Sequence, residues 1–196
     1  WAQNDKYPSL AQPEEAYHGL NFYESFGDLA YTTYGHAVGL RDLGPTMAPM
    51  NAYLTIMGIE TLALRMEKHV SNAVKVANYL HNHDKVSWVS YAGLGESKYF
   101  NLAKKYLPKG AGSVFTFGIK GGYDAGVEFV EKCQLLSHLA NIGDTRSLVL
   151  HPASTTHRQL TETQRISAGA GDDVIRLSIG LETIDDIIAD LSQALS

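Results

Sequence analysis

Apolar residues recur at helical spacing between residues 50 and 80, and charged or polar residues fill most positions between them. An α-helix turns once every 3.6 residues, so side chains three or four positions apart share a face. The spacing predicts one long helix or two helices end to end, with Gly58 as the candidate for a bend. The apolar positions are Met50, Leu54, Met57, Leu64, Val70, Val74, Ala77 and Leu80.

Short strand-like stretches alternate with amphipathic ones from residue 85 to the end of the chain. Val86, Trp88 and Ser90 occupy every second position of residues 85–91, which is typical of a half-buried strand. The alternation predicts an α/β fold with helices packed on a mixed or antiparallel sheet, because connections such as residues 143–146 are short enough for antiparallel pairing. Further strands are expected at residues 113–119, 138–142, 147–150 and 173–181, and further helices at residues 97–107, 124–136, 160–166 and 183–195.

Two of the expected helices begin with capping signals. Thr161 and Gln164 have the spacing of a capping box, and Thr183 and Asp186 have the same spacing before the last helix. The last helix also carries an apolar stripe, which indicates that it packs against the sheet. This stripe consists of Ile184, Ile187, Ile188, Leu191 and Leu195.

Residues 1–48 differ from the rest of the chain. They are rich in aromatic side chains and glycine and have no sustained helical or strand period. A segment of this kind does not bury a core of its own, so we expect it to pack on something larger.

Composition narrows the class of protein. The chain has 196 residues, 44% of them hydrophobic, an ordinary composition for a globular domain. Its net charge is −5 and it contains no basic run, so neither nucleic acid nor an anionic membrane is an expected partner. No apolar run is long enough to span a bilayer. The single cysteine, Cys133, cannot form an internal disulfide and is expected to be a small buried hydrophobe, which favours a cytoplasmic location.

Arg176 is the most conspicuous charged residue of the expected strands. It lies in the middle of residues 173–181, on the face opposite Ile175, Leu177 and Ile179. A strand would hold its guanidinium rigidly, and that group matches a carboxylate in a two-point grip. Arg176 is therefore either an anchor for a substrate carboxylate or a sheet arginine paired with an Asp or Glu. Periodicity alone favours the second interpretation.

Hydrogen-bonding side chains crowd residues 151–159, directly after an expected strand. His151 and His157 could contribute to a metal site, but no cysteine, further histidine or carboxylate lies nearby at ligand spacing, so no metal is expected. No Gly-x-Ser-x-Gly elbow supports a serine hydrolase. The glycines of residues 109–114 and 168–173 lack the Gly-Lys-Ser/Thr ending of a phosphate loop and indicate turns.

Four longer motifs together resemble the Cys/Met-metabolism family of pyridoxal-phosphate enzymes. They are RDLGPTMAPMNAYLTIMGIETLALRMEKHVSNAVKVANYL, KYLPKGAGSVFTFGIKGG, LANIGDTRSLVLHPASTTHRQL and VIRLSIGLETIDDIIADLSQAL. The resemblance runs over nearly the whole chain and is weakest over residues 1–40. It implies the C-terminal domain of a fold-type I enzyme at residues 61–196. Residues 1–60 would then be the tail of the large cofactor domain and the start of a connecting helix.

The resemblance also implies roles for three substrate-binding residues. Arg176 matches the arginine that grips the substrate α-carboxylate, which reverses the preference drawn from periodicity. Asn141 stands where related lyases commonly carry Ser beside the substrate. Thr156 matches a residue that helps to orient the network on the cofactor side.

Within the family, Asn141 and the segments RDLG and TTHRQL favour the sulfhydrylase branch. Its members replace the acetate of O-acetyl-L-homoserine with sulfide or methanethiol and give homocysteine or methionine. A cystathionine γ-synthase, a methionine γ-lyase and a non-catalytic α/β ligand-binding module stay open as alternatives. Ala48 and Ala92 depart from the usual pattern, which carries Ser and Pro there.

The resemblance further implies that part of the enzyme is missing. The family binds pyridoxal phosphate through a lysine in a Ser-x-Thr-Lys context, and this sequence has no such motif. We therefore expect no catalytic residue in this chain, a cofactor bound mainly by the N-terminal half of the same enzyme, and no activity of the chain alone. The other expected partners are the small-molecule substrates and further copies of the enzyme, in a homotetramer.

Overall fold

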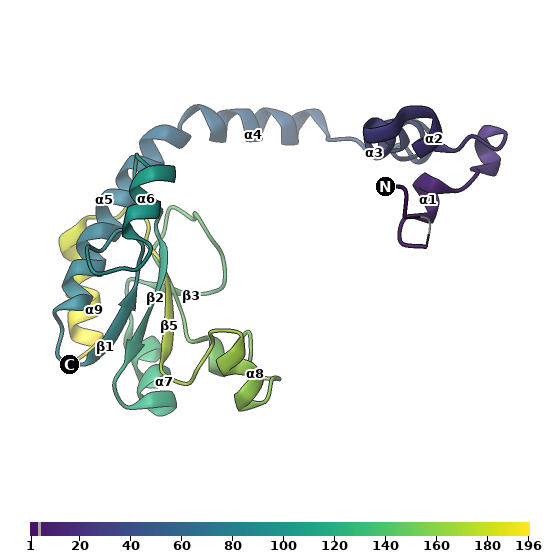
Figure 1. Ribbon diagram of the computed structural model, residues 1–196. Helices are drawn as coiled ribbons and strands as arrows, with labels where there is room; N and C mark the ends of the chain where they lie inside the picture. Colours follow the sequence, from purple (N-terminus) through teal and green to yellow (C-terminus); the bar gives the residue numbers. More distant parts are fainter. Residues whose placement is uncertain (4) are drawn as a thin grey trace. The chain divides into compact units, whose positions relative to one another are not determined.

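The computed structural model describes residues 1–3 and 5–196, which form two compact units, Trp1–Gly58 and Ile59–Ser196 (Figure 1). Each unit is described by itself. No helix among the described residues is both long enough and apolar enough to cross a bilayer.

The first unit consists of short helices around one aromatic ring. Phe22 is 1% exposed, and its ring lies within 6.0 Å, centroid to centroid, of the rings of Tyr17, Phe26 and Tyr34. Such a small aromatic cluster is consistent with the absence of a long apolar period in this part of the sequence. The elements are α1 (Pro8–Ala11), η1 (Glu15–Tyr17), α2 (Phe22–Phe26), η2 (Gly27–Leu29), α3 (Ala30–Tyr34) and η3 (Gly35–Leu43).

Two helices follow end to end, α4 (Pro49–Glu60) and α5 (Leu62–His81). The sequence left one helix or two open, and the structure has two: Gly58 lies within α4, and the helix is interrupted at Thr61, with φ −99° and ψ 0°. A glycine costs a helix only about 1 kcal/mol, which its neighbours can offset. The inner face of α5 is fully buried and carries Ala73, Val76, Ala77 and Leu80.

The second unit contains a five-stranded sheet in the order β1-β2-β5-β4-β3. All neighbours are antiparallel except β3 and β4, which are parallel, so the predicted mixed sheet is confirmed. The antiparallel pairing expected across residues 143–146 is wrong, because β3 and β4, which these residues help to join, run in the same direction. The strands are β1 (Val86–Ser90), β2 (Val114–Ile119), β3 (Ser137–His138), β4 (Leu148–Leu150) and β5 (Val174–Ser178).

Two strands differ from the sequence prediction. In β1 the pairing register shifts between Val86 and Trp88, so Trp88 is 38% exposed and Tyr91, just beyond the strand, joins Val86 in the core. A bulge of this kind moves the following side chains to the other face. The strand expected at residues 138–142 ends at His138, because the Leu139 amide donates to the main-chain oxygen of Ser137 at 3.0 Å and turns the chain there.

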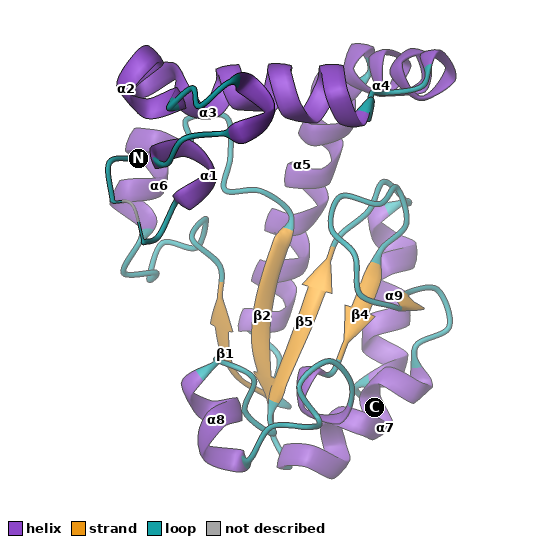
Figure 2. Ribbon diagram, turned by 90° about the vertical axis from the view of Figure 1, so that its right-hand side faces the viewer, coloured by secondary structure: helices purple, strands orange, loops and turns teal. Residues whose placement is uncertain are grey.

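Helices cover one face of the sheet, as Figure 2 shows for α5 (Leu62–His81) and α9 (Ile184–Ala194). Phe129 of α7 (Gly122–Lys132) meets Phe117 of β2 edge to face at 5.6 Å, and both belong to this core. The remaining elements are α6 (Phe100–Tyr106), η4 (Pro152–Ser154) and α8 (Glu162–Ser167). The predicted α/β layering is therefore confirmed.

Of the two capping predictions, one is confirmed and the other is wrong. Thr161 and Gln164 form both bonds of a capping box at the start of α8, as predicted. Thr183 precedes α9, but its side chain makes no capping bond, so that prediction is wrong. The amide of Asp186 instead donates to the main-chain oxygen of Thr183 at 3.1 Å.

Candidate active site

Arg176 lies in the middle of β5, between two neighbouring strands. Its register partners are Thr116 of β2 and Leu150 of β4, so these three side chains share one face of the sheet. Ile175 and Leu177 point to the other face and are fully buried against the helices. The predicted alternation along this strand is therefore correct, and Arg176 is partly buried on the face opposite the helical layer.

The Arg176 guanidinium contacts a main-chain carbonyl and no acid. Its Nη2 donates to the carbonyl oxygen of Asn141 at 3.1 Å. Among the described residues, no carboxylate forms an ion pair with it. The acid in the neighbouring loop, Asp144, is already paired with Arg146 at 3.3 Å, and this hydrogen bond lowers the pKa of Asp144. The alternative of an arginine paired with Asp or Glu is therefore not what the structure shows.

Asn141 sits in the loop between β3 and β4. Its side-chain Oδ1 accepts from the amide of Ile142 at 2.9 Å, and the amide of Gly143 donates to Ser178 Oγ at 3.4 Å. Ser178 lies two residues beyond Arg176 and on the same face of β5, because side chains alternate along a strand. Two side chains of one strand therefore hold one short loop.

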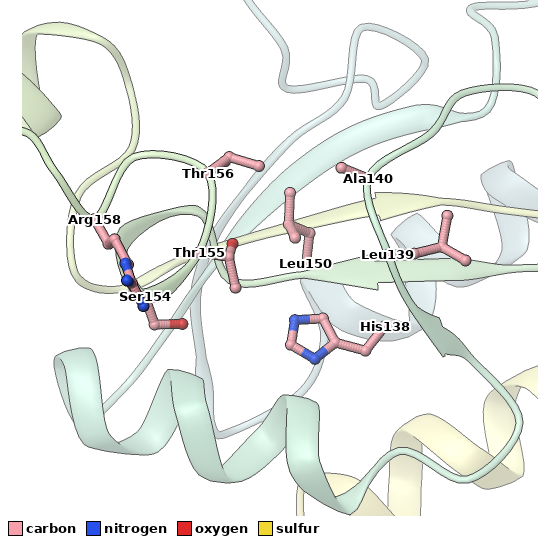
Figure 3. A pocket seen from close by; sticks show the side chains of 8 residues that line it. All are labelled: His138, Leu139, Ala140, Leu150, Ser154, Thr155, Thr156 and Arg158. Carbon is pink, nitrogen blue, oxygen red and sulfur yellow. The ribbon is translucent and has the colours of Figure 1, made fainter.

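A pocket of about 530 Å³ opens beside this loop. In Figure 3, Leu150 lies between the segment with Thr155 and Thr156 and the segment with Leu139 and Ala140. Arg176 and Asn141 border the pocket without lining it, since Ala140 precedes Asn141 and Leu150 is the strand partner of Arg176. The lining residues are His138, Leu139, Ala140, Leu150, Ser154, Thr155, Thr156 and Arg158.

Thr156 is an exposed part of the pocket wall. Its Oγ1 lies 2.8 Å from Nδ1 of His157. Within the described part of the chain, it makes no hydrogen bond to Arg176 or Asn141. The structure thus brings together two of the three predicted site residues and places the third on the adjoining wall.

The loop after β4 is held by a buried histidine. His151 is fully buried, with Nε2 2.9 Å from the main-chain oxygen of Asp172 and Nδ1 2.9 Å from Ser154 Oγ. Thr155 Oγ1 donates to the main-chain oxygen of His151 at 2.7 Å. The hydroxyls at Ser154 and Thr155 therefore fold the loop. Both ring nitrogens of His151 are used, which leaves none for a metal ion.

The remaining candidates from the sequence are the thiol of Cys133 and a metal-binding cluster. Cys133 is partly buried, and burial together with the nearby charge of Asp190 raises its pKa to about 12, so the thiol stays protonated at neutral pH. Among residues 1–3 and 5–196 there is no cluster of three His, Cys, Asp or Glu side chains that could hold a metal ion.

Sequence reasoning missed Ser178, Leu150, His138 and Arg158 as parts of the site. A period-two pattern from Arg176 could have identified Ser178, because the two share a face. His138 and Leu150 line the pocket because β3 and β4 lie side by side, and Arg158 lines it from the loop after η4 (Pro152–Ser154); no local pattern records this arrangement.

Comparison with known proteins identifies the family to which this chain belongs. Residues 10–196 match the model of the family described as Cys/Met metabolism PLP-dependent enzyme. Homocysteine synthase of Schizosaccharomyces pombe is 50% identical over 196 residues, and O-acetyl-L-homoserine sulfhydrylase of Leptospira meyeri is 47% identical over 201 residues. These alignments cover 100% and 98% of this chain but 46% of either relative, so the chain spans about half the length of the curated relatives it matches.

A solved structure shows the same architecture. A Campylobacter jejuni protein described as an O-acetylhomoserine (thiol)-lyase, with a pyridoxyl-lysine phosphate group, matches with a TM-score of 0.85 and 44% identity. The match covers 98% of this chain and 46% of that protein. With the family model matching most of its length, the chain belongs to the Cys/Met-metabolism family of pyridoxal-phosphate-dependent enzymes.

Proposed function

We propose that this chain is the C-terminal portion of an O-acetyl-L-homoserine sulfhydrylase. The reaction replaces the acetate on Cγ with sulfide or methanethiol and gives homocysteine or methionine. The relatives named O-acetyl-L-homoserine sulfhydrylase and homocysteine synthase, at 47% and 50% identity, support this choice within the family.

One observation carries the proposal: Arg176 is a partly buried arginine beside a pocket, with no acid partner among the described residues. An arginine is rarely enclosed without a partner for its charge. Its planar fork binds a carboxylate through two parallel N–H···O bonds. We therefore assign Arg176 to the α-carboxylate of the amino-acid substrate.

Asn141 and Thr156 complete the proposed substrate side of the site. The Oδ1 of Asn141 is taken by Ile142, which leaves its amide NH₂ as a donor toward a substrate. Thr156 lines the pocket, and its hydroxyl next to His157 would orient the network on the cofactor side. Both are binding and orienting roles, which contribute to the rate by holding the reacting groups in place.

The residues of this pocket do not form a cofactor site by themselves. Among the described residues, no lysine and no aromatic ring other than His138 lines it, so they do not offer the amine that this family bonds to pyridoxal phosphate. We assign the cofactor to the part of the enzyme outside residues 1–196. When bound, it supplies an electron sink for proton removal from the substrate.

The two units have different proposed origins. Residues 1–60 would be the tail of the large cofactor domain and the start of the connecting helix, and residues 61–196 the small C-terminal domain. The surface of α4 is evidence for a further binding partner, because none of the helix residues is buried. The proposed partners are the N-terminal half of the enzyme and further copies of it. Exposed apolar residues of α4 are Met50, Tyr53, Leu54, Ile56, Met57 and Ile59.

Product analysis tests the proposed reaction. The pyridoxal-phosphate-loaded enzyme that contains this chain is given O-acetyl-L-homoserine with sulfide, and homocysteine is expected. Incubation with methionine alone should release little methanethiol, whereas a methionine γ-lyase would release it readily. Cystathionine as the main product, when cysteine competes with sulfide, would indicate a cystathionine γ-synthase and contradict the proposal.

A further inference from the structure

The loop Asn141–Gly143 is tied to β5 in a way that the proposed reaction does not itself require. Arg176 donates to the Asn141 carbonyl at 3.1 Å, and the Gly143 amide reaches Ser178 Oγ at 3.4 Å. The first bond has ordinary length, and the second is near the upper limit. The carbonyl of Asn141 is therefore the stronger of the two links.

The carbonyl restricts the guanidinium. An arginine side chain has about 2 kcal/mol of rotamer entropy to lose when it is fixed. A bond from Nη2 to Asn141 fixes one arm of the planar fork in advance. Its other N–H groups have no partner among the described residues, so they are available for a second acceptor. Preorganisation of this kind strengthens binding without any added contact to the ligand.

The direction of this carbonyl depends on the backbone of the loop. Gly143 has φ +74°, and a Cβ built there would meet nothing within 4 Å. Space therefore does not require glycine, but the left-handed backbone favours it. The bond from the Ile142 amide to Asn141 Oδ1 fixes the same turn from its other end.

We propose that residues 141–143 form a positioning element for Arg176, in which Asn141 acts through its main-chain carbonyl and Gly143 supplies the backbone shape that aims it. Asn141 and Gly143 thereby set how well the site recognises a carboxylate. This inference rests on the proposed function of Arg176 as the carboxylate anchor, and it adds the residues that orient the anchor.

A matched pair of glycine substitutions tests it. Gly143→Ala strains the loop, whereas Gly169→Ala introduces the same strain after α8, at φ +70° and also with nothing within 4 Å of the new Cβ. Both variants should lose similar stability. In the loaded enzyme, Gly143→Ala should raise KM for O-acetylhomoserine about tenfold, while kcat changes about twofold or less, and Gly169→Ala should leave KM unchanged.

A binding measurement separates positioning from general damage. Calorimetric titration of the loaded enzyme with L-norvaline and with L-norvalinamide compares ligands that differ only at the carboxylate. Gly143→Ala should weaken the binding of norvaline about tenfold and leave that of norvalinamide within about twofold. Unchanged norvaline binding, or equal weakening of both ligands, would overturn the proposal.

The wild-type titration distinguishes this failure from failure of the proposed function. If the wild-type enzyme binds norvaline and norvalinamide equally, Arg176 is not a carboxylate anchor, and the proposed role itself is wrong. Should Gly143→Ala fail to fold, Ser178→Ala removes the second link with little loss of volume, and Ser192→Ala on the exposed side of α9 is its control. Ser178→Ala should weaken norvaline binding about threefold, because its bond is longer, and an unchanged affinity would count against the proposal.

Discussion

A single side chain of β5 carries the chemistry proposed for this site, and its neighbours explain why it is available. Asp144 neutralises Arg146 at 3.3 Å, so the acid in the adjoining loop does not compete for Arg176. Asn141 offers Arg176 a carbonyl, which accepts a hydrogen bond but leaves the positive charge uncompensated. The site therefore keeps a positive charge that an incoming carboxylate can neutralise.

Arg176→Lys should reveal the geometric part of that interaction. Lysine keeps the charge, but it has no planar fork and cannot hold the Asn141 carbonyl and a two-point carboxylate at once. We expect KM for O-acetylhomoserine to rise about 10- to 100-fold, the range expected from losing a hydrogen bond to a charged group. Steady-state kinetics of the loaded enzyme measure this. Arg146→Lys, on a side chain that is 62% exposed, is the control, and an equal rise there would refute the assignment.

The sequence predicted the position of Arg176 on β5, but it did not predict the contacts that surround its side chain. A period of two was enough to place Arg176 opposite Ile175 and Leu177. Its bond to the Asn141 carbonyl joins positions 35 residues apart through a main-chain atom that every residue has. No residue type marks such a contact in a sequence, so it could only come from the folded chain.

At the scale of elements, a buried carboxylate joins α9 to the end of α7. Asp190 is 6% exposed and accepts hydrogen bonds from the amides of Gln134, Leu135 and Leu136 at 2.8–3.0 Å. These amides turn away from the helix that the sequence predicted to continue through residue 136, so α7 ends at Lys132. The amphipathic pattern of residues 124–136 could not show this, because the competing acceptor lies more than 50 residues later.

Asp190→Asn should therefore destabilise the second unit. The neutral amide has one acceptor oxygen in place of two, so at least one of the three N–H groups, that of Leu136 buried and the other two partly buried, loses its partner. We expect a loss of about 1–3 kcal/mol in the free energy of unfolding, measured by urea denaturation. Asp185→Asn on the exposed side of the same helix should cost about 0.5 kcal/mol or less, through the helix dipole alone. Equal losses in the two variants would contradict the role of Asp190.

The same carboxylate predicts a loss of stability in acid. Burial raises the pKa of Asp190, but the bonds from Leu136, Gln134, Leu135 and Gln193 lower it more, so the net pKa in the folded state is below the ordinary value. A lowered folded pKa stabilises the fold above about pH 4, the pKa of an unfolded Asp, and this contribution is lost as the pH falls through the folded pKa. Urea midpoints between pH 6 and pH 3 should fall more steeply for the unmodified chain than for Asp190→Asn. Parallel curves would show that Asp190 does not contribute.

At the scale of the whole molecule, the two units differ in how much they bury. Residues 59–196 contain the sheet and its helical layer, whereas the core of residues 1–58 is little more than the cluster around Phe22. Limited chymotrypsin digestion of the chain alone should therefore remove the first unit and leave a fragment that begins near residue 58, because the exposed Tyr53, Leu54 and Met57 offer cleavage sites there. Mass measurement of the fragment identifies the cut. Initial cleavage within residues 86–178 would contradict the assignment of the stable core.

The chain by itself should not turn over O-acetylhomoserine. Its pocket presents an arginine at the border and hydroxyls on the wall, but no lysine among its lining residues, and the chain spans 46% of the relatives that carry the named activity. Residues 1–196 mixed with pyridoxal phosphate, O-acetylhomoserine and sulfide are expected to give no homocysteine, because the described pocket offers no amine to bond the cofactor. The longer enzyme under the same conditions is the positive control, and its Arg176→Ala variant tests whether the turnover uses this site. Robust turnover by residues 1–196 would show that one of the lysines of this chain binds the cofactor. It would contradict the proposal that the cofactor is held by the part of the enzyme outside residues 1–196.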